Sequence, residues 1–148
     1  MSYHERRAIV SFVSTALIAM IYAAVMVQRY PAGDAYSADV FRFWGAFILI
    51  LIPVSIIAKI LVTIGFSIVN TIATREEDQE VMDERDKLIE LRATRNSQYV
   101  FGIGVVLAMG ALVIDQTPSV MFALLFCAGV VSELVSEAST FFIYRRGF

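Results

Sequence analysis

The sequence predicts an all-α integral membrane protein built as a four-helix bundle, and three observations lead to that prediction. First, 58% of the 148 residues are hydrophobic, whereas a soluble globular chain is about 45–50% apolar. Second, this excess is concentrated in four blocks that are too long for the core helices of a soluble protein. Third, most basic residues flank these blocks on one side of the expected bilayer. We therefore expect a single membrane domain over residues 1–148.

Four apolar runs are the expected membrane spans. Residues 8–27 form a run of twenty residues, which is enough to cross the roughly 30 Å hydrocarbon core of a bilayer. A signal peptide has a shorter apolar region of about 7–15 residues, so we expect this first span to be uncleaved. The second, at about 43–73, is longer than a bilayer needs and contains Pro53, which we expect to kink the helix. The third and fourth cover about 99–114 and 118–144.

The link between the third and fourth spans is very short. It reads "DQTP" and ends in Thr117 and Pro118, which is typical of an N-cap followed by proline at the first helical position. A link of this length requires the two spans to form an antiparallel hairpin.

Positive charge predicts the orientation of the chain. Only Arg29 and Arg42 lie on the expected outer side, and Lys59 lies within the second span. The other nine basic residues lie on the opposite side: Arg6, Arg7, Arg75, Arg85, Lys87, Arg92, Arg95, Arg145 and Arg146. The positive-inside rule therefore places both termini and the middle loop in the cytoplasm. Four aromatic residues are expected to mark the outer interface: Tyr30, Tyr36, Phe43 and Trp44.

The middle loop, residues 75–98, is charged and contains no glycine or proline. We expect it to be a cytoplasmic helix that continues into the third span, with Asp83 able to cap a helix start. Its acidic residues come first and its basic residues come nearer the lipid, as membrane electrostatics favours. This gradient is explained by a solvated helical extension. The alternative is a docking helix for a partner protein, formed by Asp83, Glu84, Arg85, Asp86, Leu88, Leu91, Arg92, Arg95 and Asn96, with Ile89 on a second apolar edge.

The segment "DERDKLIELRATRNSQYV", residues 83–100, resembles the most characteristic segment of a family of small prokaryotic four-span membrane proteins to which no reaction is assigned. The matching positions are Asp83, Glu84, Arg85, Asp86, Ile89, Arg95 and Asn96. The "IYRRG" ending, residues 143–147, is also similar. The resemblance implies a multi-pass protein of the cytoplasmic (inner) membrane, but it implies no chemistry.

Two spans carry polar residues on one face each. In the second span these are Ser55, Lys59, Thr63, Ser67 and Asn70, and in the fourth they are Glu133, Ser136, Glu137, Thr140 and Tyr144. Counting turns from the cytoplasmic ends places Lys59 and Glu133 at nearly the same depth, so we expect an ion pair between them. Two acids in one span bring its insertion energy close to zero, so the fourth span should depend on the other helices. The polar residues could join helices, form a proton or cation pathway, or contact another membrane protein.

These features favour a non-enzymatic interaction, accessory or regulatory subunit. The alternative is a small proton, cation or solute transporter or channel made by a parallel oligomer. Glu133 and Glu137 lie one turn apart on one helix, which is a poor arrangement for acid and base catalysis. With His4 and Cys127 as the only histidine and cysteine, a zinc site is not expected, and we expect no cofactor. A net charge of −2 gives no reason to expect nucleic-acid binding. The expected partners are the lipid bilayer, a membrane or cytoplasmic protein, and further copies of the chain.

Overall fold

A computed structural model describes residues 3–74 and 84–146 of the chain. These residues form four helices: α1 (Tyr3–Val27), α2 (Ala38–Thr74), α3 (Glu84–Val113) and α4 (Pro118–Arg146). Each is long and apolar enough to cross a membrane, which confirms an all-helical architecture with four candidate spans. Residues 75–83 of the expected connector, Asp83 among them, lie outside the described residues.

The helix boundaries follow local sequence signals. α2 begins at Ala38, earlier than the start of its apolar run, because the carbonyl oxygen of Ser37 accepts a hydrogen bond from Val40 N at 3.2 Å and Asp39 lies in the first turn. Serine is a favoured residue before a helix, and an acidic residue in the first turn complements the helix dipole. α3 runs without interruption from Glu84 to Val113, so residues 84–98 of the charged segment belong to the same helix as the third apolar run.

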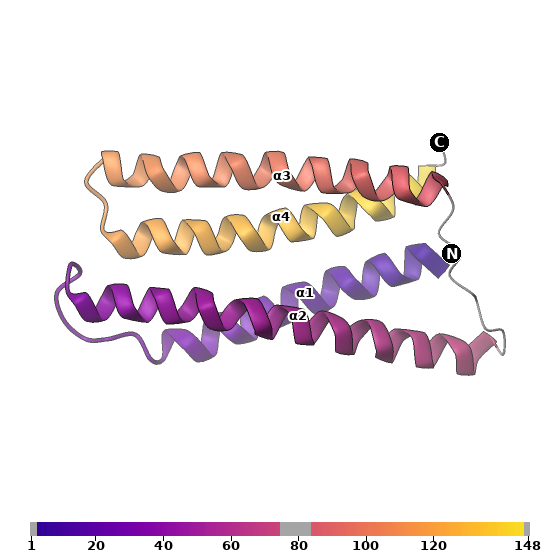
Figure 1. Ribbon diagram of the computed structural model, residues 1–148, viewed down its shortest axis with the longest axis horizontal. Helices are drawn as coiled ribbons and strands as arrows, with labels where there is room; N and C mark the ends of the chain where they lie inside the picture. Colours follow the sequence, from indigo (N-terminus) through magenta and orange to yellow (C-terminus); the bar gives the residue numbers. More distant parts are fainter. Residues whose placement is uncertain (1–2, 75–83, 147–148) are drawn as a thin grey trace.

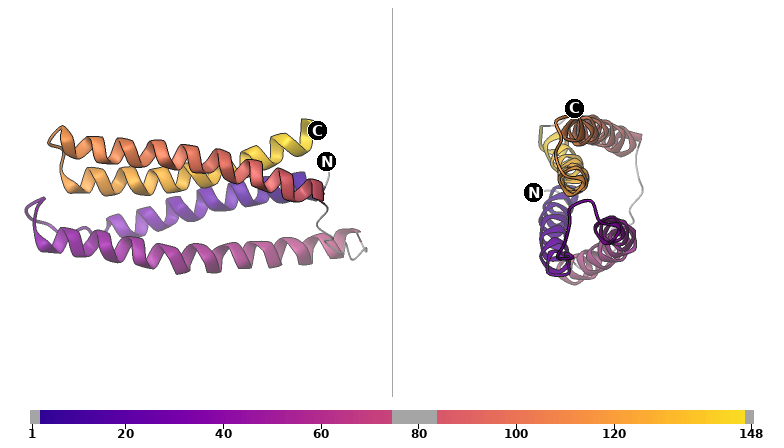
Figure 2. Two further views of the ribbon diagram at one scale, coloured as in Figure 1. Left: turned by 45° about the horizontal axis from the view of Figure 1, so that its top comes forward. Right: turned by 90° about the vertical axis from the view of Figure 1, so that its left-hand side faces the viewer.

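The helices are arranged as an open ring in the spatial order α3, α4, α1, α2 (Figures 1 and 2). α4 packs against all three other helices, most extensively against α3, while α2 and α3 make no contact along their described lengths. The described ends Tyr3 and Arg146 lie at one end of the bundle, which we call the terminal end (Figure 1). The opposite end, where short links join α1 to α2 and α3 to α4, is the hairpin end (Figure 1).

The α3–α4 link closes with a Schellman motif. Gln116 N donates to the carbonyl oxygen of Ala111 at 3.0 Å, and Asp115 N donates to that of Leu112 at 3.2 Å. Asp115 has a φ of 58°, the left-handed conformation that this motif requires after the helix end. Glycine is the usual residue at this position, and aspartate tolerates it better than most. α4 then begins at Pro118, as the sequence predicts, and the two helices form the expected antiparallel hairpin.

Small residues allow α3 and α4 to lie very close together. A Cβ atom built on Gly104 would lie 2.2 Å from Cβ of Ala128, which leaves no room for any side chain. Ala108, Ala111 and Ala128 are buried along the same contact. In a bilayer, where apolar side chains gain little by leaving lipid, such close backbone approach is the main source of attraction between helices.

An aromatic cluster holds the hairpin end together. Its buried residues are Tyr22, Met26, Val40, Trp44 and Phe47. The Trp44 ring stacks on that of Phe122 of α4, with centroids 5.6 Å apart, and Trp44 Nε1 donates to Ser119 Oγ at 3.1 Å. Trp44, expected to mark the outer interface, lies near the hairpin end and is also a buried contact between helices. The cluster lies at the hairpin end, where it joins α2 to α1 and α4.

Candidate functional site

The polar residues of α4 are shared among its three neighbours. Glu133 faces α2, Glu137 faces α1, and Tyr144 faces α3, each through a side-chain contact with that helix. Because α4 is central, its polar side chains reach partners on α1 and α2 on one side and on α3 on the other, and α3 contacts neither α1 nor α2 along their described lengths. The prediction from insertion energies that the fourth span depends on the other helices is in keeping with this central position.

Lys59 and Glu133 form an ion pair between α2 and α4, through Lys59 Nζ and Glu133 Oε1. This is the pairing that the comparison of depths predicts. Both residues lie within long apolar stretches of their helices, several turns from either end. The pair is not enclosed by the bundle, since 49% of the Lys59 side chain and 38% of the Glu133 side chain are exposed. Charges at such a depth usually face a protein interior or water rather than lipid.

Glu137 has a different kind of partner. Ser11 Oγ of α1 donates a hydrogen bond to Glu137 Oε1 at 2.6 Å. Glu133 and Glu137 lie one turn apart on α4. Glu133 therefore contacts the ammonium group of Lys59 on α2, and Glu137 contacts the hydroxyl of Ser11 on α1. We call Ser11, Lys59, Glu133 and Glu137 the membrane polar cluster. It brings together α1, α2 and α4 at the middle of the bundle.

At the terminal end, α3 and α4 are joined by two further polar contacts. Tyr144 Oη donates to Asp86 Oδ1 at 2.7 Å, and Asn96 Nδ2 donates to Ser139 Oγ at 3.3 Å. Ile89, expected on an apolar edge of a docking helix, is fully buried instead. Asp86, Ile89 and Asn96 therefore belong to the α3–α4 contact.

Replacing Tyr144 with phenylalanine should loosen the start of α3. The change removes the hydroxyl that donates to Asp86, a charge-assisted hydrogen bond worth about 1.5 kcal/mol or more when it is shielded from water. We expect faster amide hydrogen exchange in residues 84–93, measured by mass spectrometry in detergent micelles, with no change in α1. Tyr36→Phe, at an exposed tyrosine of the hairpin end, is the control. Equal exchange in Tyr144→Phe and the unmodified protein would contradict this role.

The remaining residues of the expected docking surface stay on the outside of α3. Leu88 is 50% exposed and Leu91 is 66% exposed. Glu84, Arg85, Arg92 and Arg95 are exposed as well. The exposed part of this surface therefore consists of two leucines surrounded by mostly basic side chains, while Asp83 lies outside the described residues.

The other predicted polar residues have more local surroundings. Ser55 Oγ donates to the carbonyl oxygen of Ile52 at 2.8 Å, and Thr140 Oγ1 donates to that of Ser136 at 3.0 Å, so both hydroxyls bond within their own helices. Thr63 is exposed on α2, and Asn70 is half-buried. The polar face expected along α2 is thus joined to α4 through Lys59, as far as the described contacts show.

The sequence did not predict the contacts of Ser11 and Tyr22, nor those of Tyr144 with Asp86 and of Asn96 with Ser139. Tyr22 Oη donates to the carbonyl oxygen of Phe47 at 2.5 Å in the aromatic cluster. Ser11 could have been singled out as a hydroxyl in a span, but the sequence does not reveal which helix lies beside it. Within residues 3–74 and 84–146, no group of three histidine, cysteine, aspartate or glutamate side chains is placed to hold a metal ion.

Known proteins give no further guide to the site. Comparisons of the chain with protein-family models, with curated proteins and with solved structures found no match.

Proposed function

We propose that this chain is a non-enzymatic subunit of a membrane assembly, with an interaction, accessory or regulatory role. In this proposal it belongs to the family of small prokaryotic four-span proteins that its charged segment resembles, and it lies in the cytoplasmic membrane. Both termini face the cytoplasm, because nine basic residues lie near the two ends of the sequence or within residues 75–98, and two lie at positions 29 and 42, around the link between α1 and α2.

The observation that carries the proposal is the exposure of the Lys59–Glu133 pair. About half of the Lys59 side chain and more than a third of the Glu133 side chain are uncovered in the single chain. An ionised side chain at the bilayer centre costs about 2.5–3.5 kcal/mol on the insertion scale. A second protein that covers the pair would remove this cost, whereas lipid would not.

The open side of the bundle supports the same conclusion. α2 has no contact with α3, and beyond the aromatic cluster it presents exposed apolar side chains on several sides, including Ile57, Leu61 and Ile64. Lipid alone can cover these side chains. The ion pair beside them is what calls for a protein partner at this position.

A proton or cation pathway is the second candidate. It is favoured by the different partners of the two carboxylates of α4, one paired with Lys59 and the other with the hydroxyl of Ser11. Paired intramembrane acids of this kind are used in proton relays. In this alternative, parallel copies of the chain would surround a shared path.

Site-specific photo-crosslinking in the native membrane tests the proposal. A photoreactive side chain at Thr63, one turn from Lys59 and exposed, should give a discrete protein adduct. The same side chain at Ile21, which is 63% exposed on α1, is the control and should give none. Differently tagged copies of the chain separate self-association from a different partner. The absence of an adduct at Thr63, or equal adducts at both positions, would overturn the proposal.

Reconstitution tests the second candidate separately. If the chain conducts protons or cations, liposomes containing it should show a flux that Glu133→Gln abolishes and Glu133→Asp retains in part. A flux that is unchanged by Glu133→Gln, or no flux at all, would exclude a pathway through this carboxylate.

A further inference from the structure

One hollow on the outer surface of the bundle is not accounted for by the membrane polar cluster. It lies along α3, has a volume of about 490 Å³, and is lined by Gln98, Tyr99, Gly102, Ile103, Val106 and Leu107. Gly102 leaves this space open, because it has no side chain and a Cβ atom built there would meet nothing within 4 Å. The hollow is shallow and open to the outside, because all six lining residues belong to one helix.

The lining of the hollow changes from polar to apolar along the helix. Gln98 and Tyr99 lie nearer the terminal end, and Ile103, Val106 and Leu107 follow toward the middle of the bundle. Nine residues separate Gln98 from Leu107, which corresponds to about 14 Å of helix. That length is roughly half of the 30 Å bilayer core, the depth of a single leaflet.

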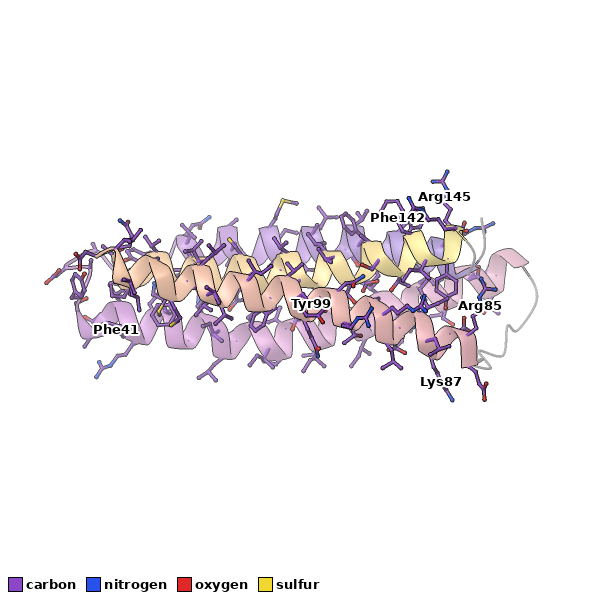
Figure 3. All side chains as sticks on the ribbon, turned by 90° about the horizontal axis from the view of Figure 1, so that it is seen from above. Phe41, Arg85, Lys87, Tyr99, Phe142 and Arg145 are labelled. Carbon is purple, nitrogen blue, oxygen red and sulfur yellow. The ribbon has the colours of Figure 1, made fainter. Side chains whose placement is uncertain are left out.

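Basic side chains stand directly above the polar end of the hollow. Arg95 precedes Gly102 by seven residues and Val106 by eleven, so at 3.6 residues per turn each of these two points within about 20° of Arg95. Lys87 lies two turns further toward the terminal end, and Figure 3 shows it on the same side of α3 as Tyr99. Arg95 and Lys87 are both exposed. An anionic group held there would lie at the level of the membrane surface.

We propose that this hollow is a binding site for an anionic phospholipid. Arg95 contacts the phosphate. The hydroxyl of Tyr99 and the amide of Gln98 contact the headgroup or glycerol region, and one acyl chain lies over Gly102 against Ile103, Val106 and Leu107. Basic residues beside anionic headgroups gain free energy from the surface potential of the leaflet. The inference rests on the proposed orientation, in which the terminal end faces the cytoplasm and its anionic leaflet, but not on the proposed role as a subunit.

Lipid binding to the purified full chain provides the test. Native mass spectrometry from mild detergent would compare phosphatidylglycerol with phosphatidylcholine of the same acyl chains, and with inorganic phosphate. We expect phosphatidylglycerol to bind about fivefold more tightly than phosphatidylcholine for each basic residue in contact. Inorganic phosphate should not compete. Equal affinity for the two lipids, or competition by phosphate alone, would overturn the proposal.

Two pairs of variants locate the site. Gly102→Leu should fill the hollow and abolish retention of either lipid, whereas Gly110→Leu, at a glycine of the same helix with equally open space, should not. Arg95→Gln should bring the affinity for phosphatidylglycerol down to that for phosphatidylcholine, and Arg42→Gln at the hairpin end should leave it unchanged. Circular dichroism and gel filtration confirm folding of each variant. Unchanged lipid retention by folded Gly102→Leu or by folded Arg95→Gln would contradict the proposal.

Discussion

Substituting Gly104 with alanine is expected to destabilise the bundle, although alanine is the better helix former by about 0.5–1 kcal/mol. The added Cβ atom would lie 2.2 Å from Cβ of Ala128, where ordinary contact begins at 3.4 Å, so α3 and α4 would have to separate by about 1 Å (3.4 − 2.2 Å). Overpacking of this kind costs about 1–3 kcal/mol. Titration of the protein in mixed micelles with sodium dodecyl sulfate, followed by circular dichroism, should show unfolding at a lower denaturant fraction.

The same helix and its partner provide controls for this result. Gly110→Ala places its methyl group in open space, so it should leave stability unchanged or raise it slightly. Gly104→Ala combined with Ala128→Gly exchanges the two small residues across the contact and should restore much of the lost stability. If Gly104→Ala behaves like Gly110→Ala, the close approach of α3 and α4 is not present in the folded protein.

Replacing Lys59 with methionine is expected to have the second large effect, because it leaves the Glu133 carboxylate without its cation inside the membrane. We expect a loss of about 2–3 kcal/mol in the free energy of unfolding in lipid bicelles, close to the cost of an isolated charge at the centre of a span. Glu133→Gln should cause a loss of similar size. The double variant, which has no charge at either position, should recover most of it, so that the coupling energy of the cycle is large.

An exposed pair on the same helix serves as the reference. Arg42 Nη1 and Asp39 Oδ1 of α2 are 3.8 Å apart, with side chains 83% and 75% exposed at the hairpin end. A pair of this kind contributes about 0–1 kcal/mol. Neutralising it should therefore change stability far less than Lys59→Met. Equal effects at the two pairs would show that Lys59 and Glu133 do not act together within the bundle.

The sequence predicted the positions of the helices along the chain far better than it predicted which helices pack side by side. Hydropathy, the proline at 118 and the short link before it were sufficient for four helices and one hairpin, because these signals are local. The Lys59–Glu133 contact could be predicted because both residues are rare in apolar spans and their depths can be counted from the helix ends. These arguments depend on how deep a residue lies in the membrane, and that depth can be counted in residues from the end of its helix.

Contacts that depend on the order of the helices around the bundle could not be predicted. Glu137 contacts Ser11 because α1 rather than α3 lies on that side of α4, and no periodicity reports this. The same holds for Ile89, which is fully buried on α3, a helix that contacts only α4 among the described helices, whereas Leu88 and Leu91 beside it are exposed. The close approach of Gly104 to Ala128 likewise follows only from the register of the two helices.

The length of α2 has a consequence for how the protein sits in its bilayer. Thirty-seven residues extend about 55 Å, against a hydrocarbon core of about 30 Å. The aromatic cluster fixes α2 to its neighbours near one surface, so the excess length must be taken up by tilt or by turns that emerge at the other surface. Hydrophobic mismatch of this kind makes the separation between the free part of α2 and α3 sensitive to acyl-chain length. A change in membrane thickness would thereby shift the arrangement of α2 relative to the other helices, as binding of a ligand can shift a conformational equilibrium.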